Sequence, residues 1–314
     1  MSIVVCCNLP DGIILGADSA VTIGRSVPQQ DGSLRHEVIK VFTGGEKIYP
    51  LGREMPKNRF AIASYGLAAL EQRTIQSWVR EFSSTLGAGM PQQADGKSAV
   101  YGVAKKAREW FRGKYDDLVL PALAKERKLP LEGIPPEQQP SLGLVVAGYD
   151  VLGSERRGEV WQVQVPEVGG EPGPWQRRGL RNFGVDWFGI TPPITRLILG
   201  FDPGLVDAMI DYFVKRHGVQ MSEQAQGEVR KILGGAEYRI PYGQMPLEEG
   251  IRHVESLLDV VIEVAAFAPG PQVCDRPTRI AVLTQDGFDW IEASFLERRR
   301  RGKEVTGYGV YRRT

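Results

Sequence analysis

The sequence has few of the residues on which many hydrolases and metalloproteins depend. Its 314 residues include only three cysteines and three histidines. The histidines, His36, His217 and His253, are scattered and share no metal-ligand spacing. Three cysteines cannot form a disulfide framework, and their scarcity is typical of a reducing compartment. We therefore predict neither a metal site nor a cofactor, and no histidine-based catalytic triad.

Long apolar runs and an excess of one charge are also missing. The 39 basic and 38 acidic side chains leave a formal charge of +1, whereas nucleic-acid binders usually carry a strong basic excess. No stretch approaches the ~18 apolar residues of a membrane span, and the first residues lack the basic region of a signal peptide. We therefore expect a cytoplasmic protein with no nucleic-acid or membrane partner.

Common motifs for phosphate binding and hydrolysis are absent as well. The chain contains no G-x-x-x-x-G-K-[ST] loop, no H-E-x-x-H helix, no Cys-x-x-Cys pair and no G-x-S-x-G elbow. The chemistry must therefore be sought in a less familiar arrangement.

The hydrophobic pattern predicts strands, two helices, strands, helices and a closing hairpin, in that order. This grouping favours an α+β fold with stacked sheets covered by helices over alternating βαβ units. Strands are expected at 3–8, 13–17, 38–42, 47–51, 60–64, 142–149, 160–165 and 180–188, with a hairpin over 278–284 and 288–293. Helices are expected at 67–86, 98–125, 194–218, 222–233 and 247–267.

The amino terminus offers a possible nucleophile. Ser2 follows Met1 directly, and a residue this small permits removal of Met1. Ser2 would then carry a free α-amine, whose ordinary pKa of about 8 suits a general base at neutral pH. The amine could accept the proton of the serine hydroxyl. Many proteins begin with Met-Ser, so this pattern alone does not establish a catalytic serine.

The residues after Ser2 supply a context for it. The chain reads SIVVCCNLPDGIILGADSAVTIG from Ser2 to Gly24, and KIYPL and FAIASYGLAA follow at 47–51 and 60–69. The later segments VVAGYD, at 145–150, and GEVW, at 158–161, complete the pattern. These segments resemble the proteasome β-subunit family, and the chain is identified here as a divergent, bacterial-type member.

The resemblance implies an N-terminal-nucleophile hydrolase with a four-layer αββα sandwich. It implies one proteasome-like domain over residues 1–296 and a basic C-terminal tail at 297–314. Insertions are expected near 25–37, 128–141 and 166–250. A homo-oligomeric ring that acts on peptides or unfolded proteins is the assembly that the resemblance implies.

Four site residues follow from the resemblance. Ser2 would attack the scissile carbonyl, and the charge of Lys47 would favour the developing alkoxide. Asp18 would pair with Lys47 and hold it in place. The backbone N–H of Gly66 would donate to the oxyanion, as a preorganised donor worth about 3 kcal/mol.

Some alternatives stay open at this stage. Lys40 begins a similar Lys-Val-Phe run, and the insertion at 25–37 prevents the spacing from deciding between it and Lys47, although the K-I-Y-P-L-G context favours Lys47. The family's aspartate followed by Ser-Gly-Gly is missing, and Asp275 is only a weak substitute. Gly189 is a weak match for a glycine near the nucleophile. A silent proteasome-like scaffold subunit and a small-molecule amidohydrolase are therefore the alternatives to a peptidase.

Overall fold

The structure is a computed structural model. It describes residues 2–28, 34–52, 59–86, 97–130, 133–152, 155–168, 172–218, 222–270, 272–291 and 310–311. Met1 and nearly all of the tail predicted at 297–314 lie outside these ranges, and so does the middle of the insertion predicted at 25–37.

The chain divides into two compact units. One comprises Met1–Gly189 and Tyr242–Thr314, and the other comprises Ile190–Pro241. The second unit falls inside the long insertion predicted near 166–250. The single domain at 1–296 stays a prediction.

The larger unit contains two main sheets. A six-stranded sheet has the order β12-β1-β2-β13-β14-β15, and a five-stranded sheet has the order β11-β10-β9-β6-β5. The strands of the first are β1 (Ile3–Asn8), β2 (Ile13–Ala17), β12 (Gly184–Gly189), β13 (Arg279–Thr284), β14 (Gly287–Ile291) and β15 (Val310–Tyr311). Those of the second are β5 (Ile48–Leu51), β6 (Phe60–Gly66), β9 (Leu142–Leu152), β10 (Glu155–Val165) and β11 (Trp175–Arg178).

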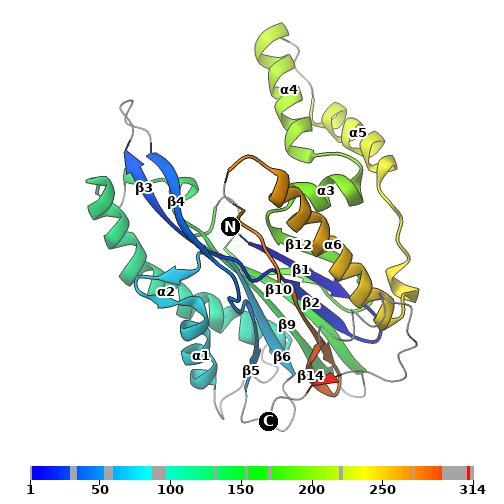
Figure 1. Cartoon of the computed structure of the whole chain (residues 1–314). Helices are drawn as coiled ribbons and strands as arrows, with labels where there is room; N and C mark the ends of the chain where they lie inside the picture. Colours follow the sequence, from blue (N-terminus) through cyan, green and yellow to red (C-terminus); the bar gives the residue numbers. More distant parts are fainter. Residues whose placement is uncertain are drawn as a thin grey trace. The chain divides into compact units, whose positions relative to one another are not determined.

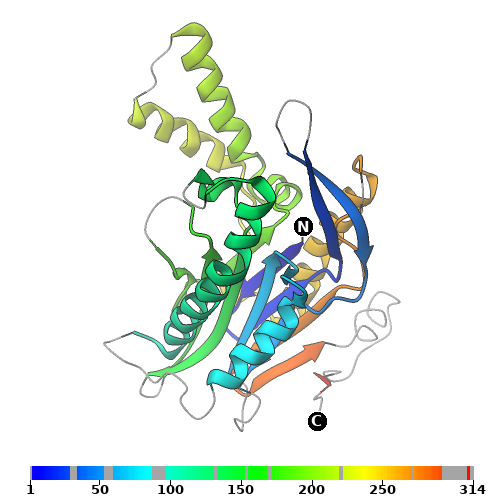
Figure 2. The ribbon, with the colours of Figure 1, turned by 90° about the vertical axis from the view of Figure 1, so that its left-hand side faces the viewer.

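Helices cover the outer face of each sheet. Helix α6 (Leu247–Phe267) packs on β1 and β2, whereas α2 (Ala99–Arg127) packs on β9 and β10 and α1 (Ile75–Leu86) contacts β5. Figure 1 shows α1 and α2 on one side of the strands and α6 on the other, and Figure 2 shows the same layers after a quarter turn. The prediction of an α+β fold with four αββα layers is therefore confirmed.

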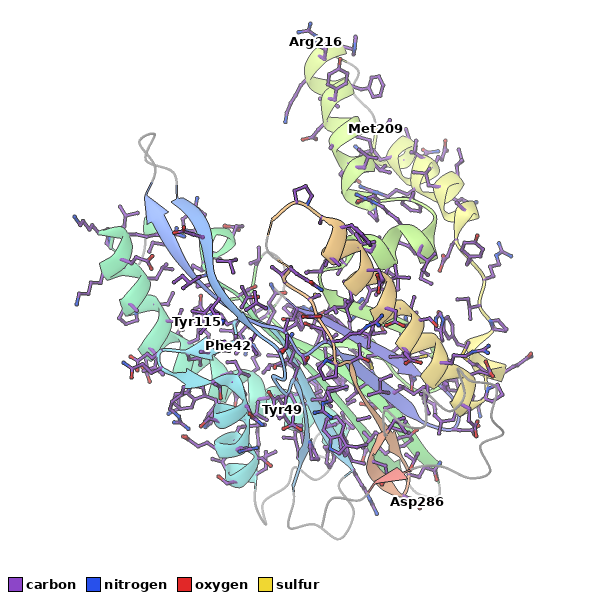
Figure 3. All side chains as sticks on the ribbon, in the orientation of Figure 1. Phe42, Tyr49, Tyr115, Met209, Arg216 and Asp286 are labelled. Atoms are coloured by element: carbon purple, nitrogen blue, oxygen red, sulfur yellow. The ribbon has the colours of Figure 1, made fainter. Side chains whose placement is uncertain are left out.

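Two buried clusters hold these layers together. One joins α1 and α2 to the five-stranded sheet and contains the fully buried Phe82, Phe111 and Tyr115, the last labelled in Figure 3. The other lies between the two sheets and contains smaller side chains such as Ala61 and Ala147. A fully buried large apolar side chain stabilises the fold by about 1.5–3 kcal/mol, so the first cluster holds the helices on their sheet and the second holds the two sheets together.

The helix predicted at 67–86 begins later than expected. Residues Ala69–Leu70 and Arg73–Thr74 form a short two-stranded ribbon (β7 and β8), and α1 starts at Ile75. The Ile75 N–H donates to the Ala68 carbonyl, 3.0 Å away, across this turn. The spacing of the apolar residues suits a helix, but ribbon pairing determines the backbone here.

A second difference concerns the segment predicted as a polar insertion near 25–37. Its described residues, 25–28 and 34–37, belong to a two-stranded ribbon of β3 (Val21–Pro28) and β4 (Leu34–Phe42). The ribbon starts three residues after Asp18, so it links the end of β2 to the strand that follows Lys47.

The unit at Ile190–Pro241 is helical. The helix predicted at 194–218 is two helices, α3 (Pro192–Leu199) and α4 (Pro203–His217), because Gly200 adopts a left-handed conformation that ends α3. Helix α5 (Glu223–Leu233) is tied to α4 by an ion pair between Arg230 and Asp207. Helix α4 exposes large apolar side chains, among them Met209, which is labelled in Figure 3.

The helices α3, α4 and α5 are each shorter than a membrane span. Within the ranges described above, no helix is long and apolar enough to cross a bilayer.

Candidate active site

Asp18 lies opposite the start of the first strand because of the register of the β1–β2 hairpin. Val4 pairs with Ala17, the last residue of β2. Asp18, the next residue, therefore lies opposite Ile3, which directly follows Ser2. The Ile3 N–H donates to Asp18 Oδ1 at 2.9 Å, and the Ala20 N–H donates to Oδ2 at 3.0 Å. The carboxylate is fully buried, and these two donors fix its orientation.

Lys47 reaches Asp18 from the other sheet. It directly precedes β5, and its carbonyl accepts a hydrogen bond from the Ser64 N–H of β6 at 2.8 Å. Its Nζ lies 2.6 Å from Asp18 Oδ1, and both side chains are almost wholly inaccessible. Removing one partner of such a buried pair leaves an uncompensated charge and costs about 3–5 kcal/mol. The two sheets are therefore coupled electrostatically at this point.

Gly189 of β12 packs closely against the Ser2 backbone. It ends β12 and pairs with Ile3, and its φ of +94° is rarely adopted by residues with a side chain. A Cβ at this position would lie 1.9 Å from the Ser2 carbonyl oxygen. Only glycine allows this close approach, so the weak sequence signal at Gly189 marks a residue next to Ser2.

Ser2, Lys47 and Gly66 line one pocket, which has a volume of about 80 Å³. Gly66 ends β6 with φ +87°, and a Cβ there would lie 2.2 Å from the Ser141 carbonyl oxygen. Ser2 is 5% exposed and lines this pocket. The structure thus brings together the four predicted residues, since Asp18 contacts Lys47 behind the pocket wall. Their catalytic roles stay predictions.

Lys40, the alternative lysine, lies elsewhere. It is exposed on β4, with its Nζ 5.8 Å from the centre of the Phe42 ring. It is not among the residues that line the pocket. Lys40 belongs to the ribbon of β3 and β4, and Lys47 is the lysine that pairs with Asp18.

Asp275 does not point its carboxylate at Lys47. Its Oδ1 accepts hydrogen bonds from the Arg276 N–H at 2.7 Å and from Gln272 Nε2 at 3.4 Å. Its backbone carbonyl accepts from the Ser19 N–H at 3.3 Å. Asp275 therefore supports the loop after Asp18 through its backbone.

The three cysteines are buried and free. Burial, with a smaller contribution from the charge of Asp18, raises the pKa of the Cys274 thiol to about 12. Burial likewise raises the pKa of Cys7 to about 12, and that of Cys6 well above its usual value. These thiols stay protonated at neutral pH and do not compete with Ser2 as nucleophiles.

Sequence reasoning missed part of the pocket wall. Glu46, Tyr49, Ser64 and Gln76 also line the pocket, and the Gln76 amide donates to Glu46 Oε2 at 2.7 Å. The Tyr49 hydroxyl donates to the Glu46 carbonyl oxygen. Burial raises the pKa of Tyr49 above its ordinary range, against the opposing effect of a hydrogen bond with Ser64, so Tyr49 is neutral at pH 7. The adjacency of Glu46 to Lys47 was the only available signal.

No group of three or more histidine, cysteine, aspartate or glutamate side chains that could hold a metal ion occurs among the residues described.

The fold of the larger unit is a four-layer αββα sandwich. Among solved structures, the chain is similar to an Anbu mutant from Hyphomicrobium sp. strain MC1, with a TM-score of 0.48 and 12% identity over 98% of this chain and 99% of that one. It is also similar to Anbu (ancestral beta-subunit) from Yersinia bercovieri, with a TM-score of 0.44 and 12% identity over 96% of this chain and 92% of that one.

No family model matches the chain, and no curated protein matches it. The prediction that the chain is a divergent, bacterial-type member of the proteasome β-subunit family is therefore wrong as a family assignment, since the similar solved structures are Anbu proteins. The short motifs that carried the resemblance lie on the hairpin and strands that build this sandwich.

Proposed function

We propose that the chain is an N-terminal-nucleophile hydrolase that cleaves amide bonds of peptides, with Ser2 as the nucleophile after Met1 is removed. The observation that carries this proposal is the buried ion pair of Asp18 and Lys47, which joins the two sheets at the pocket that Ser2 lines. A buried ion pair is a weak source of stability. Its position beside a serine is better explained by chemistry.

The first step is acylation. The Ser2 α-amine takes the proton of the Ser2 hydroxyl while Oγ bonds to the scissile carbonyl carbon. The ammonium of Lys47, held by Asp18, stabilises the negative charge on Oγ, and the Gly66 N–H donates to the carbonyl oxygen as it becomes an oxyanion. The carbon–nitrogen bond then breaks, and the leaving amine takes the proton from the α-ammonium.

The second step is hydrolysis of the ester on Ser2. Water attacks the ester carbonyl, and the α-amine accepts a proton from this water. The serine oxygen leaves and takes the proton back, which regenerates the hydroxyl and releases a carboxylic acid. Every proton thus passes among Ser2, the substrate and the attacking water, and none passes through Lys47.

A fluorogenic peptide assay tests the proposal with two substitutions at one position. Ser2→Ala keeps a small residue after Met1, so processing continues, but it removes the hydroxyl and should abolish turnover. Ser2→Thr keeps a hydroxyl and should retain turnover. Equal activity of the alanine variant and the unchanged protein would refute the assignment of Ser2.

A catalytically silent scaffold is the second candidate function. It is favoured by the position of the Asp275 carboxylate, which is bonded to Arg276 and Gln272 within its own loop. Retention of Met1 in the purified protein, read from its intact mass, would favour this candidate because Ser2 would lack a free amine. The homo-oligomeric ring and the cytoplasmic location stay predictions, and native mass measurement tests the ring.

A further inference from the structure

One acidic residue lines the pocket that Ser2 also lines. Glu46 is the acidic residue among those that line the pocket, and Lys47 is the basic one. Lys47 is already paired with Asp18 at 2.6 Å. Glu46 takes part in none of the ion pairs formed by the described residues, and its Oε2 accepts a hydrogen bond from Gln76 at 2.7 Å. The amide orients the carboxylate without neutralising it.

The other groups on the wall leave this charge uncompensated. Tyr49 is neutral, and its hydroxyl donates to the backbone carbonyl of Glu46, not to the carboxylate. Ser64 offers a hydroxyl only. Among the residues that line the pocket, the Glu46 carboxylate is therefore the group with which a positive ligand group would pair.

The size of the pocket limits the ligand. A buried water needs roughly 10–15 Å³ of such volume, so about 80 Å³ accommodates several waters or one extended side chain. Apolar wall residues, including Leu67 and Ile75, suit a chain of methylene groups. Lysine and arginine combine such a stem with a charged end.

We infer that this pocket binds a cationic side chain of the substrate, with Glu46 accepting hydrogen bonds from the ammonium or guanidinium group. The cation belongs to the residue that supplies the carbonyl of the scissile amide, because Ser2 lines the same pocket. The inference rests on the proposed function for the position of the scissile bond, and it names lysine or arginine peptides as the substrate class.

Equilibrium binding to the Ser2→Ala protein tests the inference without any need for turnover. Acetylated tripeptide amides that differ only in a last residue of lysine, norleucine or glutamate are titrated by calorimetry. A charge-assisted contact should make the lysine peptide bind about tenfold more tightly than the norleucine peptide, and the glutamate peptide should bind most weakly. Equal or tighter binding of the norleucine peptide would overturn the inference.

Glu46→Gln in the same background should reduce the lysine-to-norleucine ratio to about two or less. The matched control is Glu109→Gln, which changes an exposed glutamate on α2 and should leave the ratio unchanged. A ratio that survives Glu46→Gln would exclude Glu46 as the determinant.

The two proposals fail separately. A lysine preference in binding, combined with an inactive unchanged protein, would refute the proposed hydrolysis and leave the pocket assignment intact. Turnover that depends on Ser2 and shows no preference for lysine over norleucine would refute the pocket assignment alone.

Discussion

Lys47 Nζ lies 2.6 Å from Asp18 Oδ1, and this contact joins the residue before β5 of the five-stranded sheet to the residue after β2 of the six-stranded sheet. Asp18 is also bonded to the N–H of Ile3, the residue after Ser2. One carboxylate therefore positions both the candidate nucleophile and the candidate charge that activates it. The two sheets have to pack together before Lys47 meets Asp18.

The first prediction concerns the stability of this pair. Asp18→Asn and Lys47→Met should each reduce the free energy of unfolding by about 3 kcal/mol, because each leaves a buried charge without its partner. The variant that carries both substitutions should lose less free energy of unfolding than the sum of the two single losses, by at least about 1 kcal/mol. Urea unfolding measures all three.

An exposed pair provides the control for this cycle. Lys105 and Glu109 lie 4.0 Å apart on α2, with side chains more than half exposed. Lys105→Met and Glu109→Gln should show a coupling of about 0.5 kcal/mol or less. Simple additivity at Asp18 and Lys47 would contradict the account of the buried pair.

The second prediction separates close packing from backbone strain at two glycines. Gly189→Ala and Gly66→Ala should each destabilise the protein and slow reaction at Ser2, because the new Cβ would meet a carbonyl oxygen at 1.9 Å or 2.2 Å. Gly44→Ala is the control, since Gly44 has φ +101° and no atom within 4 Å of a new Cβ. It should cost only the strain of the backbone conformation, about 1–3 kcal/mol.

Thermal unfolding and labelling of Ser2 by an electrophile are the two measurements. If stability and labelling fall no further at Gly189 and Gly66 than at Gly44, the surrounding backbone can move to accept a Cβ. These two glycines would then not position Ser2.

The third prediction is a pH dependence of stability at His253. Burial lowers the pKa of His253 in the folded protein, where its Nε2 lies 3.1 Å from the Tyr242 hydroxyl. The unfolded imidazole titrates near its ordinary pKa of about 6.5. The unfolded chain therefore binds more protons between that value and the lower folded pKa, so stability falls as the pH drops through this window.

His253→Gln should flatten the stability profile below about pH 6.5. His217→Gln, at an exposed position on α4, serves as the control. Denaturant unfolding at several pH values measures the profiles. Identical slopes for the protein and its His253→Gln variant would contradict the prediction.

The parts of the site that the sequence predicts are those set by contacts between residues close together along the chain. The position of Asp18 follows from a local feature, the hairpin around Asp11-Gly12, whose register sets Asp18 opposite Ile3. Choosing Lys47 over Lys40 was harder from the sequence, because the ribbon of β3 and β4 lies between Asp18 and Lys47 along the chain and makes the number of residues between them uninformative. The buried position of Lys47 against Asp18 required the packing of two sheets.

The wall of the pocket was beyond sequence reasoning for the same reason. Glu46 and Gln76 are thirty residues apart, and although Gln76 lies in a helix both in the prediction and in the structure, nothing in the sequence indicates that the two side chains meet. The helix begins only at Ile75, because the ribbon before it satisfies its backbone groups by strand pairing. Periodicity cannot separate these outcomes over so short a segment.

The central claim is that Ser2, once freed of Met1, is the nucleophile. Mass measurement of the N-terminal peptide, after incubation with an electrophile selective for N-terminal nucleophiles, tests it most directly. We predict that Met1 is absent, that Ser2 carries one probe adduct, and that Ser2→Ala carries none. Retained Met1 without an adduct, or labelling that survives Ser2→Ala, would contradict the account.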